Sequence, residues 1–405
     1  MNDKEIYLTA FEAKPNVGTE AGLAWNWAQA YIRQGLTPIV LTNTVQSPGE
    51  VTQWELAGIK LVTLGPSRAS SAPEGMASML KLSFEFTSWR KSCEEFLDAL
   101  PQRTRAIVHH VSWGSARLRL PLPSKRSDLI SVIGPLGGGQ LPVLKGLDWR
   151  TTLTETLRLG TFLVSFINRP SIWFGRRKPN IVLYTNTQTK KFLRVKGFKN
   201  LHPMFADGIL NAKPIENLAL GSKTEESYVL FWAGRFVPTK RPDLAVLIAA
   251  DLQSKGHRTT LHMAGSGPEM QKVVDLANAL NVNSVFFGKV PWNEMTICYE
   301  SSFVFLFHSM RDSSSPGILE AASRGIPSVG LRVSGAGDFV PLEVFQGPKK
   351  YVSSVEFVRQ SSQIIERLIR DNDKYQFHSD QSILFAGKQT WDSKVQTVLS
   401  LLGPS

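Results

Sequence analysis

The sequence has 405 residues, more than one hydrophobic core usually organises, and therefore predicts two domains of similar size. Its hydrophobic content of 42% is ordinary for a globular protein. The 46 basic and 34 acidic residues give a formal net charge of +12, which favours an anionic partner. The two cysteines, Cys93 and Cys298, are far apart and lack metal-ligand spacing, so a reduced cytoplasmic setting is expected rather than secretion.

Neither an export signal nor a membrane span is predicted. No secretory pattern is recognised at Met1–Glu5. The most apolar run, Leu159–Asn168, is far shorter than the ~20 residues that a membrane-spanning helix needs. We therefore expect a cytoplasmic protein.

The first strand is predicted at Glu5–Thr9, followed by a small-residue loop, Pro15–Gly22, and an amphipathic helix, Leu23–Gln34. Within the loop, Thr19 followed by Glu20 suits a helix cap that needs no ligand. This order of strand, glycine-containing loop and helix is consistent with an α/β domain.

A later strand, Ala106–Gly114, carries two adjacent histidines. Strand alternation points His109 and His110 to opposite faces of the sheet. Each can equally be an ordinary buried histidine with satisfied nitrogens, and the sequence leaves open which of them meets a ligand, with a slight preference for His110. The next strand, within Ile130–Gln140, runs into glycines that permit either a close ligand approach or a mobile loop.

Basic residues interleaved with aromatic and apolar ones crowd residues 169–199. The cluster contains Arg169, Arg176, Arg177, Lys178, Lys190, Lys191 and Lys199 among Ile172, Trp173, Phe174, Phe192 and Leu193. It suits peripheral docking on the anionic inner face of a membrane. A solvated basic face, with its aromatics in the core, is slightly favoured over docking. Nucleic-acid binding would also use this charge, but no nucleic-acid motif is recognised.

A polar, helix-breaking run at residues 211–226 is predicted to link the two domains. The N-terminal domain is then expected at residues 1–210 and the C-terminal domain at residues 227–387. The last segment, about residues 388–405, has the apolar spacing of an amphipathic helix.

The C-terminal half places two cations after a predicted buried strand. Tyr228–Phe231 is followed by a tight turn and a helix that begins near Pro242, with Arg235 and Lys240 on the connecting loop. Two cations beside a helix N-terminus make an anion-binding site. Both can instead be solvated loop cations, which is the commonest state of a surface charge.

A second strand, Thr260–Ala264, breaks into the turn Gly265–Pro268 before another helix. Ligands of open α/β sheets bind at such strand ends. The glycines and the proline also have a purely structural explanation, because glycine supplies positive φ and proline starts helices.

A third strand, Ser302–Phe307, leads through Asp312 to a serine- and glycine-rich turn and then to Glu320 in the first turns of a helix. The turn leaves backbone N–H groups free to meet phosphate oxygens. The two carboxylates are free to accept hydrogen bonds from hydroxyl groups. Glu320 alone would be explained by the helix macrodipole, which favours an acidic residue near a helix start.

These motifs, in this order and spacing, resemble the retaining glycosyltransferases of family 4, which have the GT-B fold. They are Gly234-Arg235 with Lys240, Ala264–Pro268, Phe287-Gly288, Asp312 through Pro327, and Ser334–Gly337. The family usually carries two glutamates eight positions apart, whereas here the first is Asp312. The resemblance implies an α/β protein of two Rossmann-like, doubly wound domains that face each other across a cleft, with the last helix crossing back to the first domain.

The resemblance also implies roles for single residues. Arg235 and Lys240 would clamp the donor diphosphate and stabilise the leaving group without a metal or other cofactor. Asp312 would lie near the donor sugar, His110 would orient hydroxyl groups, and Glu320 would accept hydrogen bonds from the ribose. Further donor contacts are expected from Gly18, Thr19, Gly234, Gly265, Lys289, Val290, Ser314, Ser315, Pro316 and Gly317.

The predicted function is therefore a metal-independent, retaining transfer of a sugar from a nucleotide-diphosphate sugar to a hydroxyl of a glycan or lipid-linked acceptor, in polysaccharide or glycolipid assembly. A nucleotide-sugar 2-epimerase of the same architecture is the alternative enzyme. A basic nucleic-acid-binding protein is the alternative that is not an enzyme. A Rossmann dehydrogenase is discounted because no Gly-x-Gly-x-x-Gly follows the first strand. The donor base, sugar, acceptor and linkage stay open.

Overall fold

The chain divides into two units, which are described separately. The computed structural model describes residues 5–18, 20–68, 76–101, 106–123, 125–141, 151–157, 178–210, 223–224, 227–292, 294–313, 315–349 and 352–403. The first unit consists of Met1–Gly139, Phe162–Ala206 and Trp391–Ser405, and the second of Gln140–Thr161 and Asp207–Thr390. The sequence places residues 140–161 in the first domain, whereas the structure groups them with the second unit.

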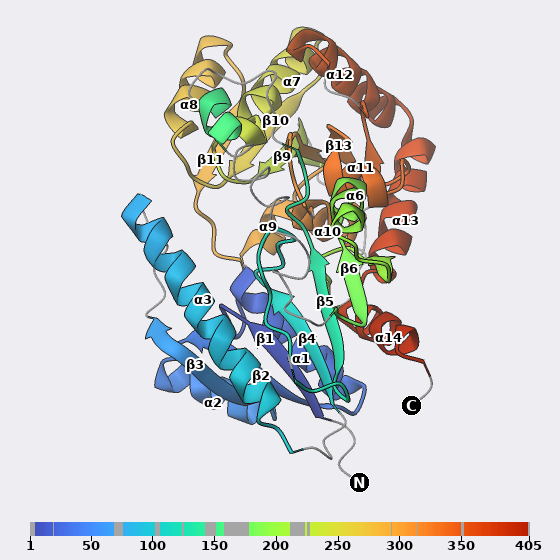
Figure 1. The fold of residues 1–405 in the computed structure, drawn as a ribbon. Coiled ribbons are helices and arrows are strands. Elements are labelled where there is room, and N and C mark those ends of the chain that lie inside the picture. The colour runs from blue at the N-terminus through green and yellow to red at the C-terminus, as the bar shows by residue number, and fades with distance from the viewer. Residues whose placement is uncertain are drawn as a thin grey trace. The chain divides into compact units, whose positions relative to one another are not determined.

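The first unit is built on a seven-stranded sheet of order β3-β2-β1-β4-β5-β6-β7, in which all neighbours are parallel (Figure 1). Its strands are β1 Glu5–Ala10, β2 Thr37–Thr44, β3 Lys60–Arg68, β4 Ile107–Ser112, β5 Ile130–Leu136, β6 Ile181–Tyr184 and β7 Leu201–Pro203. Its helices are α1 Leu23–Arg33, α2 Pro48–Leu56, α3 Met76–Asp98, α6 Thr187–Val195 and α14 Trp391–Leu401. The strand order reverses between β1 and β4, as in a doubly wound fold.

Alternation along β1 supplies both cores of the first unit. Ile6 and Leu8 lie in one buried cluster with residues of α1, α2 and α14, including Trp27 and Trp54. Tyr7 faces the other way, where its ring meets Phe96 of α3 at 6.2 Å between centroids. A parallel sheet that is covered on both faces buries both sets of side chains, and the strand therefore reads as a continuous apolar run.

The second unit repeats the topology with the order β11-β10-β9-β12-β13-β14 in parallel pairs, plus β8 antiparallel to β9. Its strands are β8 Lys223–Thr224, β9 Ser227–Ala233, β10 Thr259–Ala264, β11 Ser284–Gly288, β12 Val304–Phe307, β13 Ser328–Gly330 and β14 Phe345–Gln346. Its helices are α7 Pro242–Ser254, α8 Met270–Ala279, α9 Met295–Glu300, α10 Pro316–Ala322, α11 Ser334–Phe339, α12 Ser354–Arg370 and α13 Asn372–Gly387, with a helical turn at residues 151–157. Strand order here reverses between β9 and β12.

Strand β8 lies inside the run that the sequence predicts as a linker, 211–226. The linker prediction is thus wrong for Lys223–Thr224, which pairs with the start of β9 and forms a hairpin. Residues 211–222 lie outside the described part of the chain. The predicted start of a helix at Pro242 is confirmed, because α7 begins there, where proline has its φ preset and needs no N–H partner.

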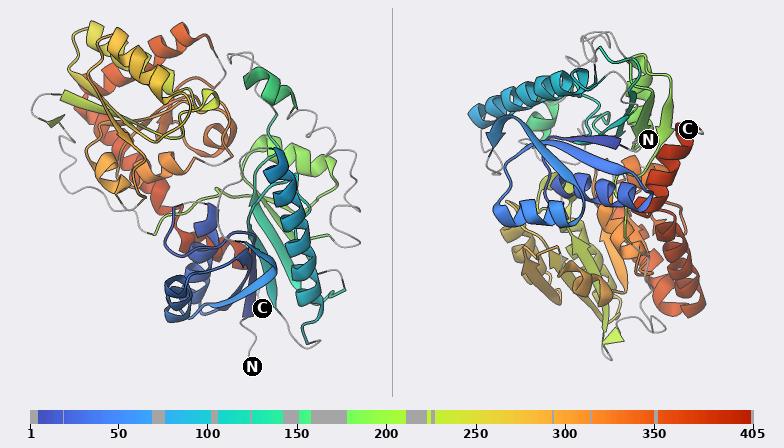
Figure 2. Two further views of the ribbon diagram at one scale, coloured as in Figure 1. Left: turned by 90° about the vertical axis from the view of Figure 1, so that its left-hand side faces the viewer. Right: turned by 90° about the horizontal axis from the view of Figure 1, so that it is seen from below.

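The last helix, α14, belongs to the first unit, as predicted for a helix that crosses back (Figure 2). Trp391 packs edge-on against Trp27 of α1 at 5.7 Å, and Asp392 accepts a hydrogen bond from Arg33 at 2.7 Å. The buried Lys394 donates to the carbonyl of Phe205 at 2.6 Å. Among the described residues, no helix combines the length and apolar character needed to cross a bilayer.

Candidate active site

The loops after β9 and β12 meet at the carboxyl edge of the second sheet, where its strand order reverses. Lys240 ends a 3-10 turn, Pro238–Lys240, that follows β9. Its Nζ lies 2.5 Å from Oδ2 of Asp312, which is on the loop after β12. Both side chains keep contact with solvent, at 25% and 18% exposed. Open α/β sheets bind ligands at this reversal point, so the pair lies where a ligand is expected.

The two loops are joined by their backbones as well as by this ion pair. The N–H of Met310 donates to the carbonyl of Thr239 at 2.9 Å. The ammonium group of Lys240 also lies 5.8 Å from the ring centre of Phe307, the last residue of β12. The structure therefore brings together Lys240 and Asp312, which the sequence assigned separately to a diphosphate and a sugar.

Arg235 lies on the same loop as Lys240 but differs from it in ion pairing. Its side chain is exposed, and no hydrogen bond or ion pair to it is found among the described residues. A guanidinium always carries its charge and offers a planar fork of donors. Arg235 is thus available to an anion from solution, whereas Lys240 already has a counter-ion.

Glycines draw neighbouring strand ends together along this edge. A Cβ on Gly265, which has φ +130, would lie 1.8 Å from the carbonyl oxygen of Gly234. Equivalent contacts of 1.8 Å would join a Cβ on Gly330 to the oxygen of Phe307, and one on Gly347 to that of Gly330. Only glycine fits such positions. Between β9 and β12 the contact is made instead by the side chains of Lys240 and Asp312.

The carboxyl group of Glu320, in α10, is surrounded by polar side chains from α9, from the segment before α9 and from the segment after α10. Burial raises the pKa of its carboxyl group, while the Tyr299 hydroxyl, the charge of Arg324 and the Trp292 indole act to lower that pKa. Tyr299 is buried, but Trp292 is 52% exposed. The carboxylate is therefore partly desolvated and already surrounded by donors.

The serine- and glycine-rich turn before α10 is close to main chain and aromatic rings. Ser315 is fully buried, and its hydroxyl has no partner among the described residues. Pro316 is exposed. A Cβ on Gly317 would come within 2.8 Å of the Phe305 ring, so the helix start needs glycine for packing. Ser314 lies outside the described residues.

The segment after β11 continues the same edge. The N–H of Gly265 donates to the carbonyl of Gly288 at 2.7 Å, which places the end of β11 beside the turn after β10. Lys289 follows and is exposed, and Val290 is half-buried. Gly234, Gly265, Lys289 and Val290 therefore lie along one edge of the second sheet.

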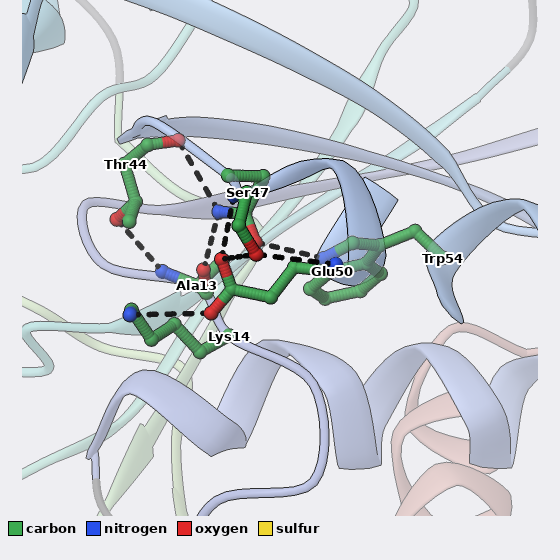
Figure 3. A network of polar contacts seen from close by, with 7 residues as sticks. Ala13, Lys14, Thr44, Ser47, Glu50 and Trp54 are labelled. Atoms are coloured by element: carbon green, nitrogen blue, oxygen red, sulfur yellow. Dashed lines mark hydrogen bonds and ion pairs between the residues drawn. The ribbon is translucent and has the colours of Figure 1, made fainter. Parts of the chain in front are cut away.

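In the first unit, the loop after β1 is held by a polar network around the start of α2 (Figure 3). Gln46 donates to the carbonyl of Ala13 at 2.8 Å, and the N–H of Ala13 donates to the Thr44 hydroxyl at 3.2 Å. Lys14 pairs with Glu50 at 3.2 Å, and Glu50 closes a capping box with Ser47. The loop is thus fixed independently of any ligand.

Of the two loop residues predicted to contact the donor, Gly18 is exposed and Thr19 lies outside the described residues. The short 3-10 turn Glu20–Gly22 precedes α1, and Gly22 is its N-cap, with no side-chain cap hydrogen bond. The helix cap that the sequence suggested at Thr19 is therefore not the cap of α1.

The two adjacent histidines on β4 face opposite ways, as alternation predicts, and both are fully buried. His109 is bonded through both nitrogens, with the Tyr31 hydroxyl at 2.9 Å and the Gly134 carbonyl at 2.8 Å. His110 meets the Thr9 hydroxyl at 2.9 Å through Nδ1. Burial lowers the pKa of His109 to about 4 and that of His110 to about 3, so both rings are neutral at pH 7.

Because both ring nitrogens of His109 are hydrogen-bonded within the protein, His109 fits the role of an ordinary buried histidine. His110 is therefore the ligand candidate of the two. Of the basic cluster that suggested membrane docking, Arg169, Arg176 and Arg177 lie outside the described residues, whereas Lys178, Lys190, Lys191 and Lys199 lie within them.

The sequence missed a pair of contacts to the Asp312 loop, defined here as residues 308–313. Arg311 Nη1 lies 2.6 Å from Oε2 of Glu155, and Ser313 accepts a hydrogen bond from Gln140 at 3.0 Å. Gln140 precedes its partner Ser313 by 173 residues, and Glu155 precedes its partner Arg311 by 156 residues. No periodicity or motif marks them, so only the fold reveals them.

Comparison with known proteins fits this geometry. Residues 216–382, which hold every charged group of the edge described above, match the family described as Glycosyl transferases group 1. The matched residues lie within the second unit. The family resemblance inferred from the motifs is thus confirmed at the level of this group.

A curated relative and solved structures extend the comparison. Protein CapJ of Staphylococcus aureus is 25% identical over 211 residues, which are 49% of this chain and 51% of CapJ, so the chain spans about half the length of that relative. The structure of WaaG, a glycosyltransferase involved in lipopolysaccharide biosynthesis, aligns with a TM-score of 0.62 at 13% identity over 99% of this chain and 100% of WaaG. Anabaena HepE in complex with UDP and glucose aligns with a TM-score of 0.60 at 12% identity over 98% of this chain and 99% of HepE. These alignments confirm the predicted GT-B fold.

Proposed function

We propose that the protein is a retaining, metal-independent glycosyltransferase that moves a sugar from a nucleotide-diphosphate sugar to an acceptor hydroxyl. The observation that carries the proposal is the edge between β9 and β12, where Arg235 lies on the same loop as Lys240, Lys240 pairs with Asp312, and the guanidinium of Arg235 has no partner among the described residues. The group 1 match covers this region. HepE, which shares the fold, binds UDP and glucose, and UDP-sugars are therefore the first donors to test.

In the proposed reaction, the bond between the donor's anomeric carbon and its phosphate oxygen breaks, and the nucleoside diphosphate leaves with the electron pair. The acceptor oxygen bonds to that carbon from the same face, and its proton passes to the departing phosphate oxygen. Arg235 meets the charge on the diphosphate with a bidentate fork. Fixed positive charge that stabilises a leaving group acts where charge develops, which is how such sites accelerate a reaction.

Lys240 and Asp312 have linked roles in this proposal. An ammonium group has three donors, so Lys240 can keep Asp312 and still reach a phosphate oxygen. Asp312 is then held beside the donor sugar, whose hydroxyl groups donate hydrogen bonds to it. Glu320, which is partly desolvated, accepts hydrogen bonds from the ribose in place of water. His110, neutral at pH 7, orients hydroxyl groups.

The acceptor is proposed to be a glycan or a lipid-linked glycan in polysaccharide or glycolipid assembly. The shared fold with WaaG, whose role is in lipopolysaccharide biosynthesis, supports this class. Docking on an anionic membrane surface would bring the enzyme to a lipid-linked acceptor, and the formal charge of +12 favours it. Flotation with anionic liposomes tests that part, and indifference to anionic lipid contradicts it.

The donor is tested first, because it can be identified without an acceptor. Thermal shift with uridine, guanosine and adenosine diphosphate sugars should show a rise for one base, by mass action. The same shift in EDTA supports metal independence. Product analysis with donor alone separates a transferase from the epimerase alternative, since only the epimerase yields an isomeric nucleotide sugar. Anomeric NMR of the transfer product checks retention. No shift with any of these sugars would contradict the proposal.

A further inference from the structure

Three consecutive residues of the Asp312 loop are each held by a different part of the second unit. Arg311 pairs with Glu155, Asp312 with Lys240, and Ser313 with Gln140. The carbonyl of Arg311 also accepts from the hydroxyl of Ser309 at 3.0 Å. A loop bound at three successive side chains has little freedom to shift, so its geometry is set before any ligand arrives.

The Glu155–Arg311 pair is the most buried of these contacts. The Glu155 side chain is 3% exposed and that of Arg311 is 18% exposed, with 2.6 Å between the charged atoms. Breaking a buried ion pair by removing one partner is strongly unfavourable, because the other charge stays buried without compensation. Arg311 therefore cannot leave Glu155 for another anion without a large loss of stability.

This restraint matters because Arg311 is the immediate neighbour of Asp312. If Arg311 were released, its guanidinium could compete with Lys240 for the Asp312 carboxylate, and a bidentate Arg–carboxylate pair is a strong competitor. Glu155 keeps that cation occupied. Among the described residues, the Asp312 carboxylate then keeps Lys240 as its side-chain partner, at 2.5 Å.

We infer that Glu155 and Gln140 are positioning residues of the donor site: by binding Arg311 and Ser313 they hold the Asp312 loop so that Asp312 stays opposed to Lys240 and aimed at the donor sugar. The inference rests on the proposed function. It assigns to Gln140 and Glu155, which the chain order places within the first half, a task in the donor unit.

The test compares Glu155→Gln with wild type and with Glu94→Gln. Glutamine keeps the shape of Glu155 and removes its charge. Glu94 is a matched control, because it also pairs with a buried arginine, Arg90 at 2.5 Å, but does so on α3 of the first unit. Hydrogen–deuterium exchange is measured first and needs no ligand. Faster exchange in E155Q confined to peptides of the Asp312 loop supports the inference, whereas faster exchange throughout the second unit overturns it as a merely structural effect.

The second readout separates the sugar from the nucleotide, using UDP and UDP-glucose. A displaced Asp312 should leave UDP binding unchanged and lower the transfer rate of E155Q about 10- to 100-fold, since small misplacements of reacting groups have effects of this size. E94Q should change neither. A parallel loss of UDP and UDP-glucose binding in E155Q, or unchanged transfer, overturns the inference.

The double variant Glu155→Gln with Arg311→Gln removes the competing cation as well as its counter-ion. It should transfer sugar faster than E155Q alone, because Lys240 no longer has a rival for Asp312. A merely structural role predicts the opposite, further loss, and that result overturns the inference. Failure of the proposed function is visible separately, because wild type itself would then bind no nucleotide sugar.

Discussion

The two sheets have the same strand order around the point where it reverses, but they place different side chains there. In the second unit, the edge carries Arg235 and the Lys240–Asp312 pair, all in contact with solvent. In the first unit, the equivalent position between β1 and β4 holds His110, buried and neutral, beside Thr9. The fold alone therefore does not decide chemistry. Charge at the reversal point of the second sheet suits a phosphate, whereas the neutral groups at that of the first sheet suit hydroxyl groups.

The largest effect is expected at the charged edge. Replacing Arg235 by alanine should lower turnover about 10²- to 10³-fold, as loss of one stabilising donor does elsewhere. The melting temperature should not change, because the side chain is exposed and has no partner in the described part of the chain. Arg258→Ala is the control, since Arg258 is an exposed cation at the start of β10. Steady-state kinetics measure the result. Equal losses in both variants would mean that bulk charge matters rather than the site.

Next in size is a change at the glycine contacts of the second edge. Gly265→Ala should lower the unfolding free energy by at least about 3 kcal/mol, because its Cβ would overlap the Gly234 carbonyl. Gly256, with φ +85 and open space around it, offers a control that should cost only about 1–2 kcal/mol. Urea denaturation compares them. Similar values would show that positive φ, and not the close approach, explains the glycine.

Substitutions of the two neutral histidines test the site of the first unit. His109→Phe should destabilise the protein by about 1–3 kcal/mol, because Tyr31 and the Gly134 carbonyl lose buried partners. His110→Phe should mainly reduce transfer. Denaturation and kinetics on the same two variants check the assignment, and the reverse pattern would move the ligand role to His109.

The same histidines predict a pH dependence. Their folded pKa values, about 4 and about 3, lie below the unfolded value near 6.5, so the unfolded chain binds more protons as pH falls. Stability should therefore fall below pH 6.5, by about 1.4 kcal/mol per pH unit for each histidine. Unfolding of wild type and H109F between pH 7 and 5 should show a shallower decline in the variant.

At Glu320 we expect smaller effects, an increase in thermal stability and a decrease in donor affinity. Because burial raises its pKa, the carboxyl group's favourable contribution is present below the unfolded pKa and is lost as pH rises through the folded value. Glu320→Gln should then melt slightly higher at pH 7, yet bind the donor about tenfold more weakly through loss of a charged acceptor. Thermal shift with and without donor measures both, and tighter donor binding would refute the ribose role.

The smallest effect is expected at the ion pair of the first edge. Lys14 and Glu50 are both partly exposed, so Lys14→Ala should lower stability by only about 0.2–1 kcal/mol and leave turnover unchanged. A large kinetic effect would break the comparison, because charge would then matter at both edges.

The sequence predicts much of this fold because its local signals are strong. Buried apolar strands that end at Gly234 and Gly265 are explicit in the sequence, and so is the proline that opens α7. Which histidine is structural is decided by Tyr31 and Gly134, and no local pattern reveals those contacts. Glu155 is harder still, since its partner is 156 residues away and its helical turn carries no motif.

The glycine contacts limit how this protein can diversify. At the carboxyl edge of the second sheet, any side chain added at Gly265, Gly330 or Gly347 would clash with the carbonyl group of a neighbouring strand end. Directed evolution toward another donor would therefore gain little from saturating those codons. Libraries should target the flanking exposed positions, such as Lys289, where new side chains meet water before they meet the scaffold.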